Sequence, residues 1–238
     1  NDAMCGICGE MRFDGGQPDH DTLTGMMAHL ERRGPDAAGQ YAEGPVALGH
    51  RRLSIIDLSE RSNQPLVDRE LGLVLVYNGT IYNYPELREQ LTARGYHFFT
   101  GGDSEVILKA YAEWGEDCPQ HLHGMFAFAI WDTLQQRLFM ARDRFGIKPL
   151  YYSLTRHYLR LASTSQALLA AGVARVVVEL PEASWAHHSG VLAEPDLGIE
   201  ADGVFVVVAD PSGVRQFSEV DLSLEAHCSV PSRLGPVL

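Results

Sequence analysis

Residues 4–10 read Met-Cys-Gly-Ile-Cys-Gly-Glu, and the roles of Cys5 and Cys8 within this stretch decide which fold the chain adopts. Their C-x-x-C spacing is typical of half a zinc site or of a redox motif. A structural zinc site needs four ligands, usually from two such pairs, and the sequence holds no second pair. A redox pair lies between a strand and a helix, whereas this pair begins a predicted strand. Two stronger readings remain: both cysteines are buried structural residues, or Cys5 is a nucleophile near the chain terminus.

The composition of the 238 residues, 45% hydrophobic and 21% charged, is ordinary for a globular protein. No apolar run approaches the roughly 20 residues of a membrane span, and the first residues do not resemble a signal peptide. We therefore expect a cytoplasmic protein. The net charge of −12 argues against nucleic acid or an anionic membrane as a partner, because both require a basic surface. The four cysteines are few and unevenly spaced, which argues against a disulfide framework.

Hydrophobic periodicity predicts an α+β fold dominated by antiparallel sheet, because short turns join most strands and the helices are grouped between them. Strands are expected at 6–13, 46–48, 53–56, 71–77, 125–131, 137–143, 151–152 and 158–162. Helices are expected from a cap at Asp19 to the break at 33–36, from Pro85 to just before Gly95, over the turns that end at Gly115, and at 166–171. After residue 173 only 175–180 and 204–209 look like strands, so we treat 174–238 as an extension of uncertain structure.

Three other stretches carry polar groups suited to a small ligand. The arginines at 51–52 precede an apolar run, and a guanidinium binds both oxygens of a carboxylate. Asn78-Gly79 offers a side-chain amide and a backbone N–H as oxyanion donors, and Asp103 could receive an ammonium group. Each also has a plainer reading, respectively a solvated surface, a hairpin turn and a helix cap. Together with a nucleophile, these groups would suit a free amino acid with a reactive side-chain carbonyl.

Eight motifs in order carry a resemblance to a known family. They are Met-Cys-Gly-Ile at 4–7, Arg-Gly-Pro-Asp at 33–36, Arg-Leu-Ser-Ile at 52–55, Gln-Pro-Leu at 64–66, Asn-Gly-x-Ile-Tyr-Asn at 78–83, Gly-Asp-Ser-Glu-Val-Ile at 102–107, Gly-Met-Phe-Ala-Phe-Ala at 124–129 and Ala-Arg-Asp-Arg-Phe-Gly-Ile-Lys-Pro-Leu-Tyr at 141–151. In this respect the chain resembles the glutaminase domain of class II glutamine amidotransferases, in the branch of glutamine-hydrolysing asparagine synthetases. The resemblance covers residues 4 to about 172.

The resemblance implies an N-terminal-nucleophile hydrolase fold, an αββα sandwich of two antiparallel sheets between helix layers. It also implies that the mature enzyme begins at Cys5, whose thiol attacks the side-chain amide of glutamine while its own α-amine assists proton transfer. An α-amine has a pKa near ~8 and is a usable base near neutral pH. Ammonia leaves, and water hydrolyses the thioester to release glutamate.

By position, the resemblance assigns roles to individual residues. Cys5, Asn78 and Gly79 would be catalytic, the latter two as oxyanion donors. Arg52 would bind the glutamine α-carboxylate, Asp103 would receive the α-ammonium, and Arg33 would brace the site. The substrate-lining set also includes Leu53, Ser54, Ile55, Ile56, Asn78, Gly79 and Thr80. No metal site is expected.

A narrower resemblance rests on Cys-Gly-Glu at 8–10, Ile-Ile-Asp-Leu-Ser-Glu-Arg at 55–61 and Leu-Ala-Ser-Thr at 161–164. These stretches are most similar to N-acetylglutaminylglutamine amidotransferases, asparagine-synthetase-like enzymes that amidate a dipeptide carboxylate. Thr80 stands where asparagine synthetases usually carry a glutamate that helps to hold the substrate ammonium, so Asp103 would carry more of that task. Residues other than glutamate at this position are in keeping with the narrower group.

The pyrophosphate loop of the synthetase half, Ser-Gly-Gly-x-Asp-Ser, does not occur in the sequence. We therefore expect glutamine as ligand and, as partners, a synthetase domain that forms the missing C-terminal part of the natural chain and possibly a second copy. ATP with Mg²⁺ is expected only in that synthetase domain. Residues 1–3 would be a leader or a remnant of expression, 4–173 the glutaminase domain and 174–238 an extension toward the synthetase domain.

Two alternatives stay open. With Asn1 to Met4 attached, Cys5 has no free α-amine, and the domain would be a catalytically silent glutamine-binding or regulatory module. The other alternative is a metal module on Cys5 and Cys8, for which Cys118, His121 and His123 would have to supply further ligands.

Overall fold

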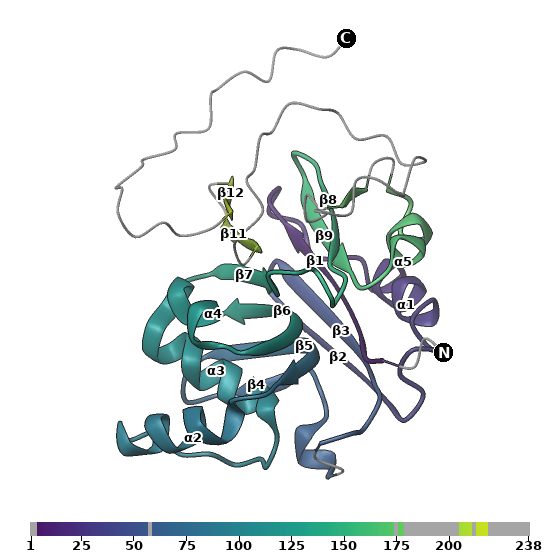
Figure 1. Cartoon of the computed structure of the whole chain (residues 1–238). Helices are drawn as coiled ribbons and strands as arrows, with labels where there is room; N and C mark the ends of the chain where they lie inside the picture. The colour runs from purple at the N-terminus through teal and green to yellow at the C-terminus, as the bar shows by residue number, and fades with distance from the viewer. Residues whose placement is uncertain (1–3, 57–58, 174–175, 179–204, 211–212, 219–238) are drawn as a thin grey trace.

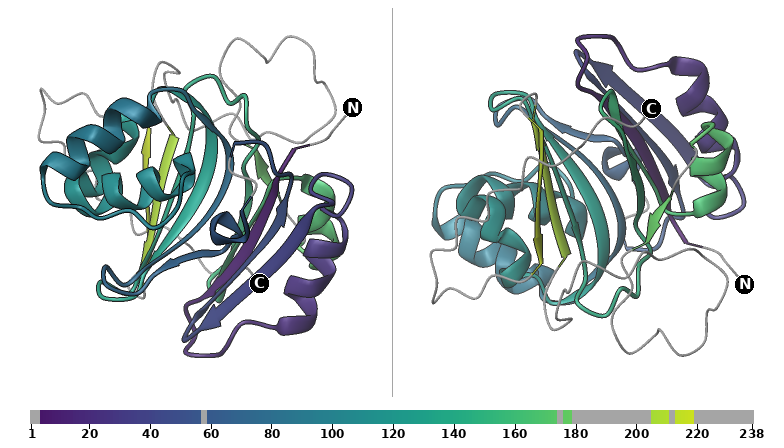
Figure 2. Two further views of the ribbon diagram at one scale, coloured as in Figure 1. Left: turned by 90° about the horizontal axis from the view of Figure 1, so that it is seen from below. Right: turned by 90° about the horizontal axis from the view of Figure 1, so that it is seen from above.

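Two six-stranded antiparallel sheets stack face to face, with helices on both outer faces (Figure 1). The computed structural model describes residues 4–56, 59–173, 176–178, 205–210 and 213–218. Figure 2 looks along the layers and shows helices, sheet, sheet and helices in succession. The predicted α+β class and the αββα sandwich implied by the resemblance are confirmed. No helix among the described residues is long and apolar enough to cross a membrane.

The first sheet has the strand order β10-β8-β9-β1-β3-β2. Its strands, in chain order, are β1 Gly6–Arg12, β2 Ala37–Glu43, β3 Val46–Arg52, β8 Tyr151–Leu154, β9 Tyr158–Ala162 and β10 Val177–Val178. β1 lies in its interior and pairs with β3 from Gly6↔Arg51 to Met11↔Val46. The start of β1 and the end of β3 therefore lie side by side.

The second sheet has the strand order β12-β11-β7-β6-β5-β4. Its strands are β4 Leu66–Asp68, β5 Leu73–Ile81, β6 Gly124–Asp132, β7 Arg137–Arg142, β11 Phe205–Asp210 and β12 Gly213–Ser218. β5 and β6 pair along their whole length, from Leu73↔Asp132 to Ile81↔Gly124. β11 pairs with β7, so part of the segment after residue 173 completes this sheet.

Helices cover each sheet on one face only. α1 (His20–Ala28) and α5 (Ser165–Ala170) pack on the first sheet, whereas α3 (Asp103–Trp114) packs on the second and contacts α2 (Tyr84–Ala93) and the short α4 (Cys118–His121). Two 3-10 turns, η1 (Glu60–Ser62) and η2 (Gly115–Asp117), complete the described helical segments. Asp19 caps α1 by accepting from the backbone N–H of Asp21, as the sequence predicts.

Three layers of apolar side chains hold the four layers together, and strand alternation produces them. In β5, Leu73, Leu75 and Tyr77 face the helices, whereas Val74 and Val76 face the other sheet. In β1, Ile7 and Met11 lie between the sheets and Cys8 lies beneath α1. β1 and β5 therefore each contribute to two cores, and consecutive side chains along these strands lie in different cores.

Three element predictions are wrong. Residues 53–56 form no strand: β3 ends at Arg52, and β3 pairs with β2 and β1. A β-branched residue favours a strand when it packs against a sheet. Ile55 is instead 70% exposed, so this preference does not operate here. β5 does not end at Asn78-Gly79 but continues to Ile81, because β6 pairs with it throughout. The predicted first helix is also too long, since α1 ends at Ala28 rather than near Arg33.

Candidate active site

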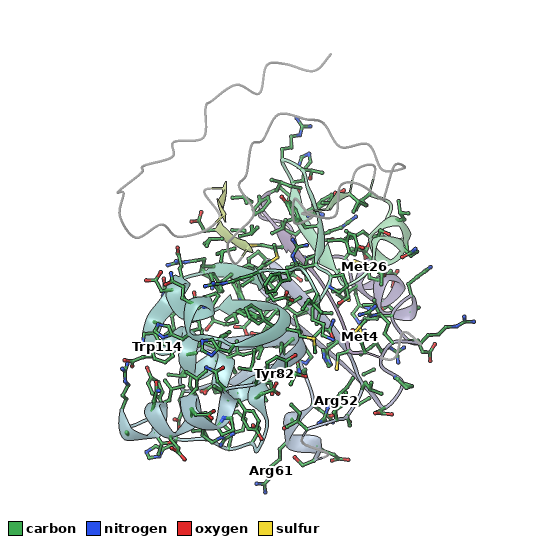
Figure 3. The ribbon with its side chains drawn as sticks, in the orientation of Figure 1. Met4, Met26, Arg52, Arg61, Tyr82 and Trp114 are labelled. Carbon is green, nitrogen blue, oxygen red and sulfur yellow. The ribbon has the colours of Figure 1, made fainter. Side chains whose placement is uncertain are left out.

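The predicted site residues meet where β1 begins and β3 ends, beside the second half of β5. Cys5 precedes β1, Arg52 is the last residue of β3, and Asn78 lies in β5. Met4 and Arg52 mark this end of the sheet in Figure 3. His50 and Asn78 share the alternation of residues that face the other sheet, so the site lies at the mouth of the inter-sheet core.

The Cys5 thiol is held by the backbone of the residue that follows β3. The N–H of Leu53 donates to Cys5 Sγ at 3.3 Å, and the Leu53 carbonyl lies 3.5 Å from the same sulfur. Burial raises the pKa of the thiol and Asp103 raises it further, while the Leu53 hydrogen bond and the positive charges of Arg52 and Lys148 lower it. The thiol is consequently protonated at neutral pH and needs a base before it can attack.

The Arg-Gly-Pro-Asp turn at 33–36 locks Cys5 against the end of β3. Arg33 Nε donates to the Cys5 carbonyl at 3.3 Å, in line with the bracing role expected for it. A side chain at Gly34 would come within 2.3 Å of the Arg51 carbonyl carbon, so only glycine permits this approach. Asp36 Oδ2 accepts from the Ser54 N–H at 2.8 Å. The motif therefore fixes the position of Cys5.

Asn78 and Gly79 present hydrogen-bond donors that the described residues leave available. Asn78 is only 2% exposed, and its Nδ2 has no hydrogen-bond partner among them. A buried amide without a partner is costly in a folded protein and points to a ligand. Gly79 is confined by β6, because an added Cβ would lie 2.2 Å from the Met125 carbonyl oxygen. Its residue type follows from this close strand pairing.

Asp103 stands at the start of α3 and reaches the edge of β5. Its Oδ2 accepts from the Tyr77 hydroxyl at 2.8 Å and from the Ile81 N–H at 3.0 Å. Burial raises the pKa of the Asp103 carboxyl, and these donors partly offset the rise. Gly102 occupies the N-cap position of α3, so Asp103 lies one residue inside the helix. Its charge is strong enough at Cys5 to affect the thiol pKa.

Arg52 is buried and tied to the loop that follows. One guanidinium nitrogen, Nη1, donates to the Ser59 carbonyl at 2.9 Å and to Asn63 Oδ1 at 2.7 Å. These contacts fix the orientation of the side chain beside Cys5. The arrangement matches a carboxylate receptor held in place before the ligand arrives.

The remaining predicted lining residues are less enclosed. Ile55 and Ile56 are exposed, and Ser54 contributes its backbone N–H to Asp36. Leu53 contacts the thiol itself. Thr80 lies in β5 directly after Gly79 and is partly exposed.

Two side chains at the site were not assigned roles from the sequence. Lys148 Nζ lies 3.2 Å from Met4 Sδ, and its pKa is lowered by burial and by Arg33. Tyr77 carries the hydroxyl that orients Asp103. Both lie in or beside the quoted motifs, but only the pairing of distant segments brings them to Cys5.

The other two described cysteines, Cys8 and Cys118, are buried in the cores between the sheets and their covering helices. Cys8 lies in the core beneath α1, and burial raises the pKa of its thiol to about 12. Cys118 lies in the core beneath α3. His121 stacks on Trp114 with 3.9 Å between ring centroids. No group of three or more potential metal ligands occurs among the described residues.

Comparison with known proteins identifies the class. The family model of the glutamine amidotransferase domain matches residues 4–186. The chain therefore belongs to the glutamine amidotransferase domain family.

Two solved structures share the fold. Glutamine phosphoribosylpyrophosphate amidotransferase from B. subtilis has a TM-score of 0.67 at 19% identity, covering 90% of this chain and 49% of that one. A structure described as the allosteric regulatory enzyme of purine biosynthesis has a TM-score of 0.69 at 20% identity.

The curated relatives that match the chain include asparagine synthetases. Asparagine synthetase [glutamine-hydrolyzing] 3 of Bacillus subtilis is 41% identical over 170 residues, which are 70% of this chain and 28% of that protein. A putative asparagine synthetase of Mycobacterium bovis is 43% identical over 182 residues, 70% of this chain and 28% of that protein. This chain is thus a glutamine amidotransferase domain homologous to about a quarter of these synthetases.

Proposed function

We propose that the chain hydrolyses glutamine to glutamate and ammonia, with Cys5 as the nucleophile. The observation that carries the proposal is the buried, unpartnered Nδ2 of Asn78, beside Gly79 at the mouth of the inter-sheet core. Two donors at this place suit the oxyanion that forms when a thiol attacks an amide carbonyl. The position of Arg52 suits the α-carboxylate of glutamine, and that of Asp103 suits its α-ammonium.

The proposed reaction needs a free α-amine on Cys5. That amine accepts the thiol proton, the sulfur bonds to the amide carbon, and the C–N bond breaks as the proton passes to the leaving ammonia. A water molecule then attacks the thioester, and glutamate leaves as the thiol re-forms. The raised thiol pKa supports the need for this base.

The ammonia would serve an ATP-dependent amidation in a synthetase domain, as the names of the curated relatives suggest. The product is asparagine or, by the narrower resemblance, the amide of N-acetylglutaminylglutamine. ATP and Mg²⁺ would bind in that synthetase domain. A homodimer is a further expectation, which light scattering would test. A silent glutamine-binding module is disfavoured, because such a module has no need of an unpartnered oxyanion donor.

The test uses the chain prepared to begin at Cys5. It should release glutamate from glutamine, and a glutamine-like alkylating agent should label Cys5. Asn78→Asp keeps the shape but removes the amide donor, so kcat should fall roughly 100-fold or more. Gln40→Glu makes the same amide-to-carboxylate change on an exposed position of β2 and should leave kcat unchanged.

A protein that begins at Cys5, is folded, and neither turns over glutamine nor reacts with the alkylating agent would refute the proposal and favour the silent module.

A further inference from the structure

The edge of β5 loses its neighbouring strand just before the proposed oxyanion donors. β4 pairs with β5 from Asp68↔Leu73 to Leu66↔Leu75. Within the described residues, no strand pairs with this edge of β5 beyond Leu75. Two side chains take the place of the missing strand at Tyr77. Gln64 Oε1 accepts from the Tyr77 N–H at 2.6 Å, and His50 Nε2 donates to the Tyr77 carbonyl at 3.0 Å.

The direction of the backbone groups follows from these bonds. N–H groups alternate along a strand between its two edges. Those of Tyr77 and Ile81 point to the open edge, where Gln64 and Asp103 accept them. On the other side of Gly79, its pairing partner Phe126 exchanges hydrogen bonds with Asp143 rather than with β5. The Gly79 N–H therefore points to the open edge as well, between two occupied positions.

We infer that Gln64 and His50 are positioning residues for the oxyanion site, because they hold Tyr77 in strand geometry and thereby aim the next two residues. The inference rests on the proposed function and adds two side chains to it. The side chains of Gln64 and His50 bond to the backbone of Tyr77. Their effect passes through the backbone of Tyr77 to Asn78 and Gly79.

The surroundings of both side chains fit this role. Gln64 is buried, and its backbone approaches β2 so closely that a Cβ at Gly39 would lie 2.2 Å from the Gln64 carbonyl oxygen. His50 is fully buried, and its pKa is lowered to about 4, mainly by burial. The ring is therefore neutral, and because a carbonyl can only accept, the proton sits on Nε2. The His50 ring is thus a neutral donor and the Gln64 amide a neutral acceptor. Together they satisfy the Tyr77 backbone in place of a neighbouring strand, without adding charge to the core.

The experiment compares Gln64→Ala with Gln64→Glu in the chain that begins at Cys5. Gln64→Ala should lower kcat at least tenfold with KM changed less than twofold, since the oxyanion exists only after attack. Gln64→Glu keeps an oxygen acceptor of the same length, its buried carboxyl should stay protonated and neutral, and it should restore kcat to within about threefold of the wild type. Amide hydrogen exchange at Tyr77 should accelerate in Gln64→Ala only. Gln40→Ala, on an exposed position, is the matched control.

His50 supplies a second pair of variants in case Gln64→Ala does not fold. His50→Gln retains a side-chain N–H donor and should keep at least a third of kcat, whereas His50→Leu should lose tenfold or more.

An active wild type whose Gln64→Ala variant has full kcat overturns this inference alone, as does a folded Gln64→Glu variant no better than Gln64→Ala. An inactive wild type that begins at Cys5 overturns the proposed function, and this inference with it.

Discussion

At the residue scale, His50 illustrates how a buried, uncharged side chain affects the stability of the fold. The sequence analysis selected its neighbours, the arginines at 51–52, because a guanidinium can bind a carboxylate. Nothing local distinguishes His50 from an exposed histidine. Only the meeting of β3 with β5 buries the ring and supplies the Tyr77 carbonyl that orients it.

Burial of His50 predicts an acid-sensitive fold. The unfolded chain protonates this histidine near pH 6.5, while the folded protein does so only near pH 4. Between these values the unfolded state holds the extra proton, so the free energy of unfolding falls as the pH falls. The loss from this group between pH 7 and pH 5 should be about 2 kcal/mol.

Urea unfolding at pH 7, 6 and 5 measures this loss. His50→Gln should flatten the pH dependence by that amount, whatever its effect at pH 7. Gln40→Ala, which changes an exposed residue without a titratable group, should leave the dependence unchanged. Equal slopes for His50→Gln and the wild type would contradict the prediction.

At the element scale, a single carboxylate organises the loop between β7 and β8. Asp143 accepts from the N–H groups of Phe126, Phe145, Ile147 and Lys148 at 2.9 to 3.2 Å. These hydrogen bonds fix the conformation of the loop, although it contains no regular helix. It carries Lys148 to the Met4–Cys5 segment, so its shape affects the site.

Asp143→Ala should cost a few kcal/mol of unfolding free energy, because four backbone donors lose a charged acceptor. The urea midpoint measures the loss. Asp117→Ala is the control, since Asp117 is exposed and accepts only from the side chain of Gln120 among the bonds described, and it should change stability by less than about 0.5 kcal/mol. An unchanged midpoint for Asp143→Ala would refute the organising role.

At the scale of the whole molecule, the second sheet is completed late in the chain. β11 adds to the free edge of β7, with Val206 and Val208 in the helix-side core and Val207 and Ala209 between the sheets. The predicted division at residue 173 stays a prediction as a domain boundary. β11, which lies beyond it, nonetheless shares both cores with residues 4–173.

Removal of β11 and β12 should therefore weaken the whole sandwich. A chain ending at residue 178 loses three buried valines and exposes the β7 edge, which should cost on the order of 5 kcal/mol and lower the melting temperature by roughly 10–20 °C. A chain ending at residue 218 retains both strands and is the comparator. Calorimetry giving equal melting temperatures for the two chains would contradict this view of the sheet.

The sequence predicted the fold class and most strands, because alternation and turn residues are local signals. It failed where pairing between distant segments decides the outcome. Asn78-Gly79 has the chemistry of a turn, yet pairing with β6 extends β5 through it. The orientation of the Gly79 N–H and the roles of Gln64 and His50 depend on where β4 stops, which no local pattern encodes.

The alternating direction of side chains along β5 also determines which mutations the domain tolerates in evolution. A substitution in β5 alters one side chain. Inserting or deleting one residue before Asn78 would instead move every following side chain to the opposite face of the sheet and every following N–H to the opposite edge of the strand. The amide would turn toward α3, and the glycine N–H would turn toward β6. Lineages of this domain should therefore vary in length within loops such as the one after Arg52 and keep the count from Leu73 to Gly79 constant.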